Sequence, residues 1–231
     1  MLYPRLWLKH WRTRRALVGY PLYDAPHKQA EHTLKEVQFQ ENYDYFMNNR
    51  LKRLAFFQAW LKRHFRVDAS INGDGLRAAN AWVNDYGGAL IGDEPDTMTI
   101  FASYMPRWEG QYVGYNVLYD IAIFIGEYLI FKRPKLRWEL YRGPKAGSGE
   151  TVSINLYRPH IGGFTRYWED DVLNVAYLAI VQSRNGSKIG HNPLTRQPNL
   201  MITSCQTSLR LANIPEGNDP IIAGDYSLEP L

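Results

Sequence analysis

Cysteine is nearly absent from this chain, because Cys205 is the single cysteine among 231 residues. One thiol cannot form an internal disulfide, which excludes a small secreted fold held together by disulfides. A zinc site built mainly from cysteines is excluded for the same reason. Cys205 could act as a nucleophile beside His160 or His191, but one buried and unreactive thiol is the commoner arrangement.

Long hydrophobic runs are also scarce. The first twenty residues contain no apolar run longer than three, so the hydrophobic region of a signal peptide is not found there. The longest apolar stretch, residues 117–131, is interrupted by Asp120 and Glu127 and is too short to span a bilayer comfortably. We therefore expect a cytoplasmic protein without a membrane span.

Sequence motifs that indicate catalysis or cofactor binding are missing too. The six histidines form neither an HExxH motif nor a pair four residues apart. The phosphate-binding patterns GxxxxGK[ST] and GxGxxG and the serine-hydrolase pattern GxSxG do not occur. We therefore predict no metal site and no cofactor. The composition, 45% hydrophobic and 22% charged, is ordinary for a soluble globular protein.

Charge is unevenly distributed, although the formal net charge is only +4. The last twenty residues contain four acids and no base, and the first fifteen contain five bases and no acid: Arg5, Lys9, Arg12, Arg14 and Arg15. Interleaved with Trp7 and Trp11, these bases could bind nucleic acid or an acidic lipid surface. Alternatively, the two ends of the chain lie close together and neutralise each other. The low net charge weighs against a dedicated nucleic-acid-binding protein.

The first half of the chain predicts an irregular N-terminal arm followed by helices. Three prolines in residues 1–26 indicate the arm. From His27 to about residue 65 the apolar spacing is helical, and we expect a break near Asn48 and Asn49. Basic residues of this segment, including Arg53, are placed on its solvated face. Three further helices are predicted over about residues 76–86, 97–104 and 111–132.

The second half predicts a small sheet and one more helix. Residues 136–142 and 151–158 alternate in polarity and are expected to pair as an antiparallel hairpin. A helix is predicted over residues 168–186, and residues 200–205 are interpreted as a strand within a proline-rich, loop-rich segment from about 187 to 231. The predicted fold is a single α+β domain, mostly helical, with a small antiparallel sheet in the second half.

Two carboxylates in an apolar helix are the candidate catalytic groups. Asp120 and Glu127 are seven residues apart, which places them on one helix face about 10 Å apart along the axis. In a cleft, burial would raise their pKa values, as acid–base catalysis requires. The favoured alternative is structural: each meets an arginine or a backbone donor, and Glu127 has Arg137 or Arg142 nearby in sequence. Gly126 indicates close approach of another backbone, the hairpin being the candidate.

Two loops are the candidate binding segments. In "RPHIGGF", Arg158 and His160 precede a glycine pair, and exposed backbone amides there could hold an anion. A turn with a satisfied histidine is the simpler interpretation. In "KIGHNPLTRQPN", His191 and Arg196 lie in a proline-bounded loop, a type of segment that often carries function.

The run "LYDIAIFIGEYLIFKRPKLRWEL" resembles a signature of uncharacterised bacterial families. In these families a hydrophobic helix carries Gly-Glu, here Gly126 and Glu127, and leads to a strand with a tryptophan, here Trp138. The resemblance covers at most residues 54–182. It implies a bacterial, cytosolic protein with a mixed helix–sheet fold, and it assigns no activity and no catalytic residue.

Three functional hypotheses follow. The first is a non-enzymatic accessory, immunity-type or adaptor protein that binds another macromolecule, with a protein as the expected partner, because aromatics are abundant and no catalytic set is recognisable. The second is a hydrolase or transferase that uses Asp120, Glu127 and His160 in a cleft between the apolar helix and the hairpin. The third is nucleic-acid binding through the N-terminal arm.

Overall fold

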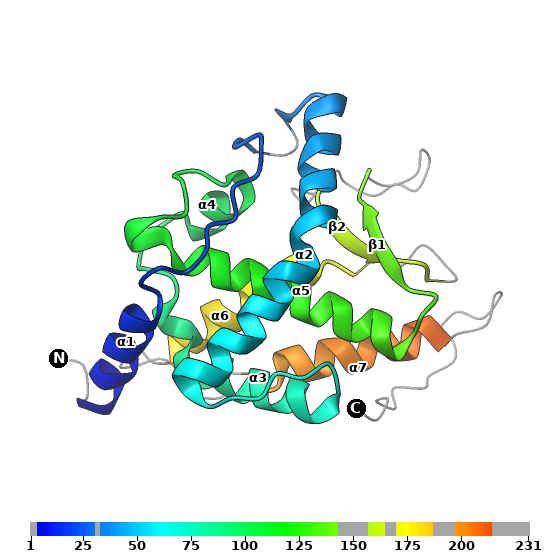
Figure 1. Cartoon of the computed structure of the whole chain (residues 1–231). Coiled ribbons are helices and arrows are strands. Elements are labelled where there is room, and N and C mark those ends of the chain that lie inside the picture. The colour runs from blue at the N-terminus through cyan, green and yellow to red at the C-terminus, as the bar shows by residue number, and fades with distance from the viewer. Residues whose placement is uncertain (1–3, 31–32, 143–156, 165–169, 187–196, 214–231) are drawn as a thin grey trace.

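The structure is a computed structural model that describes residues 4–30, 33–142, 157–164, 170–186 and 197–213, with side chains from Trp7 onward (Figure 1). The described residues form seven α-helices, two short 3₁₀ helices and two strands. In chain order they are α1 (Pro4–Ala16), α2 (Glu36–Phe65), α3 (Gly73–Tyr86), η2 (Gly87–Ala89), α4 (Thr97–Ser103), η3 (Gly110–Tyr112), α5 (Gly114–Lys132), β1 (Arg137–Leu140), β2 (Pro159–Gly162), α6 (Val172–Gly186) and α7 (Leu200–Asn213).

Helix α5 lies in the centre of the fold. From Gly114 to Leu129 every residue except Glu127 is buried, and α2, α6 and α7 pack against it (Figure 1). A helix that is apolar all round belongs in a core. By length and composition Gly110–Lys132 is long enough to cross a membrane, contrary to the expectation from sequence, but 83% of its most apolar window is buried inside the fold.

The small sheet confirms the predicted fold class, mostly helical α+β with an antiparallel pair late in the chain. Strand β1 begins with the predicted alternation, Arg137 exposed and Trp138 buried, and it pairs with β2 so that Trp138 lies opposite Ile161. The second strand is not where the alternation predicted it, because β2 forms from the "RPHIGGF" segment that we interpreted as a turn. All four residues of β2 are buried, so no alternation marks it. Residues 151–156 lie outside the described part of the chain.

Helix α2 is continuous over 30 residues. It begins at Glu36 rather than at His27, and the predicted break near Asn48 and Asn49 is wrong. The side-chain amide of Asn49 donates to the Tyr45 carbonyl at 2.8 Å, so this polar residue is satisfied without interrupting the helix.

Half of the predicted N-terminal arm is helical, since α1 covers 13 of its residues. Pro4 is the first residue of α1, a position where the missing N–H of proline costs nothing, so this proline marks a helix start and not an irregular segment. Helix α1 packs against α3 and η2 at the edge of the molecule (Figure 1). The Lys9 ammonium binds the Asp85 carboxylate at 2.6 Å and helps to hold α1 there.

The predicted strand at residues 200–205 is wrong, since these residues begin helix α7. The buried positions of α7 follow helical spacing rather than alternation, and they include Met201, Cys205 and Leu209. Ile202 and Thr203 are β-branched and favour a strand locally, but packing against α3, α5 and α6 outweighs that preference.

Candidate functional site

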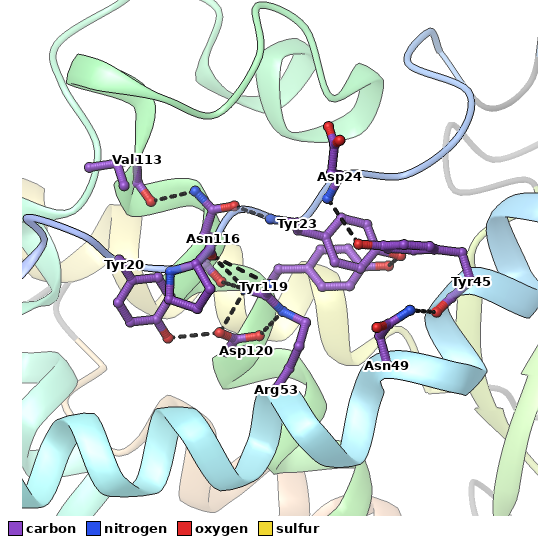
Figure 2. Close-up of polar contacts among 11 residues, drawn as sticks. Tyr20, Tyr23, Asp24, Tyr45, Asn49, Arg53, Val113, Asn116, Tyr119 and Asp120 are labelled. Carbon is purple, nitrogen blue, oxygen red and sulfur yellow. Dashed lines mark hydrogen bonds and ion pairs between the residues drawn. The ribbon is translucent and has the colours of Figure 1, made fainter.

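Asp120 lies at the centre of a buried polar network between α5, α2 and the chain that follows α1 (Figure 2). Its side chain is fully buried. Arg53 of α2 donates from Nε to Oδ1 at 2.5 Å and from Nη2 to Oδ2 at 2.8 Å, and the Tyr20 hydroxyl donates to Oδ2 at 2.7 Å. Both carboxylate oxygens therefore have charged or hydroxyl donors.

The network extends through Asn116, one turn earlier on α5. Its Oδ1 accepts from the Tyr23 backbone N–H at 2.6 Å, and its Nδ2 donates to the Trp108 and Val113 carbonyls at 2.7 and 2.8 Å. Arg53 also donates to the Pro21 and Asn116 carbonyls. The placement of Arg53 on a solvated face was therefore wrong: this guanidinium ties residues 20–23 to α5.

Burial raises the pKa of Asp120 to about 6, while the Arg53 charge and the two hydrogen-bond donors oppose that rise. At neutral pH the carboxylate is therefore ionised and paired. Burial also raises the pKa of Tyr20 well above its ordinary value, which keeps the phenol protonated as a donor. Because both carboxylate oxygens of Asp120 already accept hydrogen bonds, this side chain is suited to holding helices together.

Glu127 has an arginine of its own. Its Oε1 accepts from Arg50 Nε of α2 at 3.0 Å and from the Trp138 indole N–H of β1 at 2.9 Å. The two arginines expected from sequence bind elsewhere: Arg142 pairs with a carboxylate of α2, and Arg137 pairs with one on its own strand.

The two carboxylates of α5 thus form two separate ion pairs with α2. Arg50 and Arg53 are three residues apart on α2, and Glu127 and Asp120 are seven apart on α5. The shared helix face predicted for the carboxylates is real, since both point toward α2. Each one is occupied by a different arginine, and this arrangement fits the structural interpretation.

The other candidate residues on β2 are buried as well. His160 is 5% exposed and contacts the Tyr141 ring edge-on at 5.4 Å, and burial lowers the pKa of this imidazole. Arg158 is 1% exposed, lies 5.0 Å from the centre of the Phe101 ring and donates to the Phe101 carbonyl at 3.3 Å. Both residues sit on or beside a buried strand, and no exposed glycine turn is formed there.

The three remaining candidate residues are His191, Arg196 and Cys205. His191 and Arg196 lie outside the described residues. Cys205 is fully buried on α7, and burial raises the pKa of its thiol well above the ordinary value, which disfavours the reactive thiolate. Within the described part of the chain, no group of three or more His, Cys, Asp or Glu side chains is placed to hold a metal ion.

Asp170, just before α6, is a buried acid that sequence reasoning did not single out. Its carboxylate accepts a hydrogen bond from the Ser208 hydroxyl of α7, and burial raises its pKa from 3.8 to about 6. Because the folded state binds the proton more tightly than the unfolded state, this group favours folding fully below about pH 4. That contribution is lost as the pH rises through about 6.

Asp170→Asn is therefore expected to change stability in a pH-dependent way. Relative to the wild type, its free energy of unfolding should increase by roughly 2 kcal/mol between pH 4 and pH 7, because the variant has no carboxylate to ionise inside the fold. Urea unfolding followed by circular dichroism at both pH values measures this difference. A difference that does not vary with pH would contradict the expectation.

Helix α1 presents its large apolar side chains to solvent. Trp7, Leu8 and Trp11 are 56%, 54% and 49% exposed, whereas the side turned to the protein carries the small residues Thr13 and Ala16, both buried. Surface helices of globular proteins normally point their large apolar residues inward. Among the side chains of α1 that the structure describes, from Trp7 onward, this polarity is reversed.

Two arginines complete what we define as the outer face of α1: Trp7, Leu8, Trp11, Arg14 and Arg15. Both arginines are exposed. The Arg15 guanidinium lies over the Trp11 ring, 5.4 Å from its centre, and Arg14 donates from Nη1 to the Gln111 carbonyl at 3.0 Å.

The structure brings together Trp7, Trp11 and Arg14, three residues that the sequence marked as candidates for binding. It adds Leu8, which sequence reasoning did not name, and Arg15, which sequence reasoning named only among the bases of the N-terminal segment. The spacing of four residues from Trp7 to Trp11 to Arg15 indicates a shared face, but only if the segment is interpreted as a helix.

Comparison with known proteins finds no family model, no curated protein and no solved structure that matches this chain.

Proposed function

We propose that this protein is non-enzymatic and binds another protein through the outer face of α1, as an accessory, immunity-type or adaptor protein in the bacterial cytoplasm. The observation that carries the proposal is the exposure of Trp7, Leu8 and Trp11 on one side of a helix whose other side is packed. A contiguous exposed apolar surface bordered by polar residues is typical of an interaction site.

The residue types support a contact surface. Tryptophan and arginine dominate the binding energy of protein interfaces. Covering the exposed half of two tryptophans removes on the order of 200 Å² from water, which corresponds to about 5 kcal/mol at about 25 cal/mol per Å² before the costs of association. That gain offsets part of the cost of association, which is about 4–15 kcal/mol.

The orientation of α1 is held by contacts on its other side. Besides the ion pair of Lys9, the Arg12 guanidinium lies 5.0 Å from the Phe65 ring centre and 5.7 Å from that of Tyr86. The Arg12 side chain also donates to the His64 carbonyl. These contacts keep Trp7 and Trp11 pointing outward, so a partner meets a preformed surface and loses less free energy to ordering.

The alternative as a hydrolase or transferase has weaker support. Asp120 and Glu127 are each paired with an arginine of α2, and His160 contacts Tyr141 on the sheet. A general base needs a free lone pair within reach of a substrate proton. Both carboxylate oxygens of Asp120 already accept hydrogen bonds, and Oε1 of Glu127 accepts two.

Trp7→Ser/Trp11→Ser should reduce the amount of partner captured from an extract of producing cells by at least about tenfold, since both anchors are removed. The measurement is a quantitative pull-down with the immobilised full chain. The matched control is Val37→Ser/Leu51→Ser, which removes two equally exposed apolar residues of α2. Glu127→Gln should not affect capture. Equal capture by the wild type and the tryptophan variant would end the proposal.

A further inference from the structure

Helix α1 carries a positive charge that the described carboxylates neutralise only in part. Residues 4–16 contain five bases and no acid. Lys9 is bound to Asp85, and the charge of Asp93 acts on His10, where it opposes that of Arg14. These are the acidic side chains whose influence on α1 is seen among the described residues.

Three guanidiniums of α1 are held by neutral groups. Arg12 rests on two aromatic rings and a carbonyl, Arg14 donates to a carbonyl, and Arg15 lies over Trp11. Within the described residues no carboxylate lies within ion-pair distance of any of the three. Because a guanidinium has five N–H donors, Arg14 and Arg15 keep donors that point to solvent beside the tryptophans.

From this charge pattern we infer that the partner of the outer face of α1 is an acidic protein surface, with carboxylates placed beside an apolar patch. The inference rests on the proposed function. Carboxylates match the planar fork of arginine in two parallel hydrogen bonds, and the apolar patch covers Trp7, Leu8 and Trp11. Charge complementarity of this kind sets which partner is chosen and how fast it associates.

Phosphate-bearing partners fit this surface less well. Nucleic-acid binding relies on neutralising many phosphates, and here two outward arginines stand beside three large apolar side chains. Bases also stack on open aromatic faces, and one face of the Trp11 ring is covered by the Arg15 guanidinium. A lipid surface offers no fixed carboxylates for two arginines with defined positions.

Defined probes test the inference. The full-length protein is titrated by fluorescence anisotropy with labelled random copolymers of glutamate and tyrosine, of lysine and tyrosine, with a labelled DNA duplex, and with vesicles of phosphatidylserine and phosphatidylcholine. The glutamate–tyrosine copolymer is expected to bind most tightly. Arg14→Gln/Arg15→Gln should weaken it by about fivefold or more, and Trp7→Ser/Trp11→Ser should weaken it as well.

Two controls keep the test interpretable. Lys52→Gln/Arg63→Gln removes the same number of charges from exposed positions of α2 and should leave the affinity unchanged. Arg15→Gln alone preserves the hydrogen bond from Arg14 to Gln111, so it reports on charge even if the double variant unfolds.

Each outcome decides between the two claims. If the glutamate and lysine copolymers bind equally, the inference of an acidic partner is overturned and the proposed function stands. The same conclusion follows if the arginine variants bind like the wild type while the tryptophan variant binds more weakly. If neither pair of substitutions weakens binding, or if no probe binds, both the acidic partner and the proposed function are overturned. Tighter binding of DNA or vesicles than of the glutamate copolymer would replace the protein partner by that class.

Discussion

Arg53→Met is expected to lower the free energy of unfolding by about 3–5 kcal/mol, because it leaves a buried carboxylate without its cation. Asp120 would then keep one hydrogen-bond donor, the Tyr20 hydroxyl, in a site that excludes water. The loss would also free residues 20–23 from α5, since Arg53 donates to the Pro21 carbonyl. Urea unfolding of the purified variant measures the effect, and Lys52→Met, on the neighbouring exposed position, should change it little.

A double substitution separates the charge from its packing. Arg53→Met/Asp120→Leu removes both ions and fills the space with apolar groups, so it is expected to be more stable than either single variant. If the two losses simply add, the ion pair does not explain the stability of this junction. A double variant as unstable as Arg53→Met alone would indicate that the hydrogen bond from the Tyr20 hydroxyl to Asp120, which the double variant also loses, matters more than the ion pair.

The partner of Asp120 was within reach of sequence analysis. Arg53 shares a helix face with Phe46, Phe57 and Trp60, all buried, which lie seven, four and seven residues from it. A cation at a core position requires an anion, and the apolar helix 111–132 supplied one. We grouped Arg53 with the other basic residues of the segment on one solvated face, although its neighbour Lys52 points about 100° away from it on a helix.

The fold was predictable where local pattern and tertiary packing agree. The alternation of β1, the buried face of α6 and the length of α5 all follow the sequence. Strand β2 and helix α7 could not be placed correctly, because β2 is buried on both sides and α7 owes its form to packing against three other helices. Local propensity is a weak guide in such segments.

The outer face of α1 shows a different limit. The sequence marked Trp7, Trp11 and Arg14 as a binding group, but it could not show which side of a helix would face the protein. Contacts with residues more than fifty positions away in the chain decide that orientation, among them Asp85 and the Phe65 ring. Such contacts leave no trace in the local pattern of residues 4–16.

Gly126→Ala is expected to lower the free energy of unfolding by about 3 kcal/mol, although alanine is the better helix former. An added Cβ would lie 2.1 Å from Cζ2 of Trp138, so one of the two elements must shift. The indole cannot move freely. Its N–H donates to Glu127 at 2.9 Å, its ring packs edge-on against Phe46, and its backbone is paired in β1.

Relief of that contact is the decisive control. Trp138→Leu alone should destabilise by leaving a cavity above Gly126 and by removing the hydrogen bond to Glu127. Combined with Gly126→Ala, it leaves room for the new methyl group, so the loss in the double variant should be smaller than the sum of the two single losses by about 1 kcal/mol or more. Strict additivity, measured by urea unfolding, would show that the indole of β1 is not what requires glycine in the central helix.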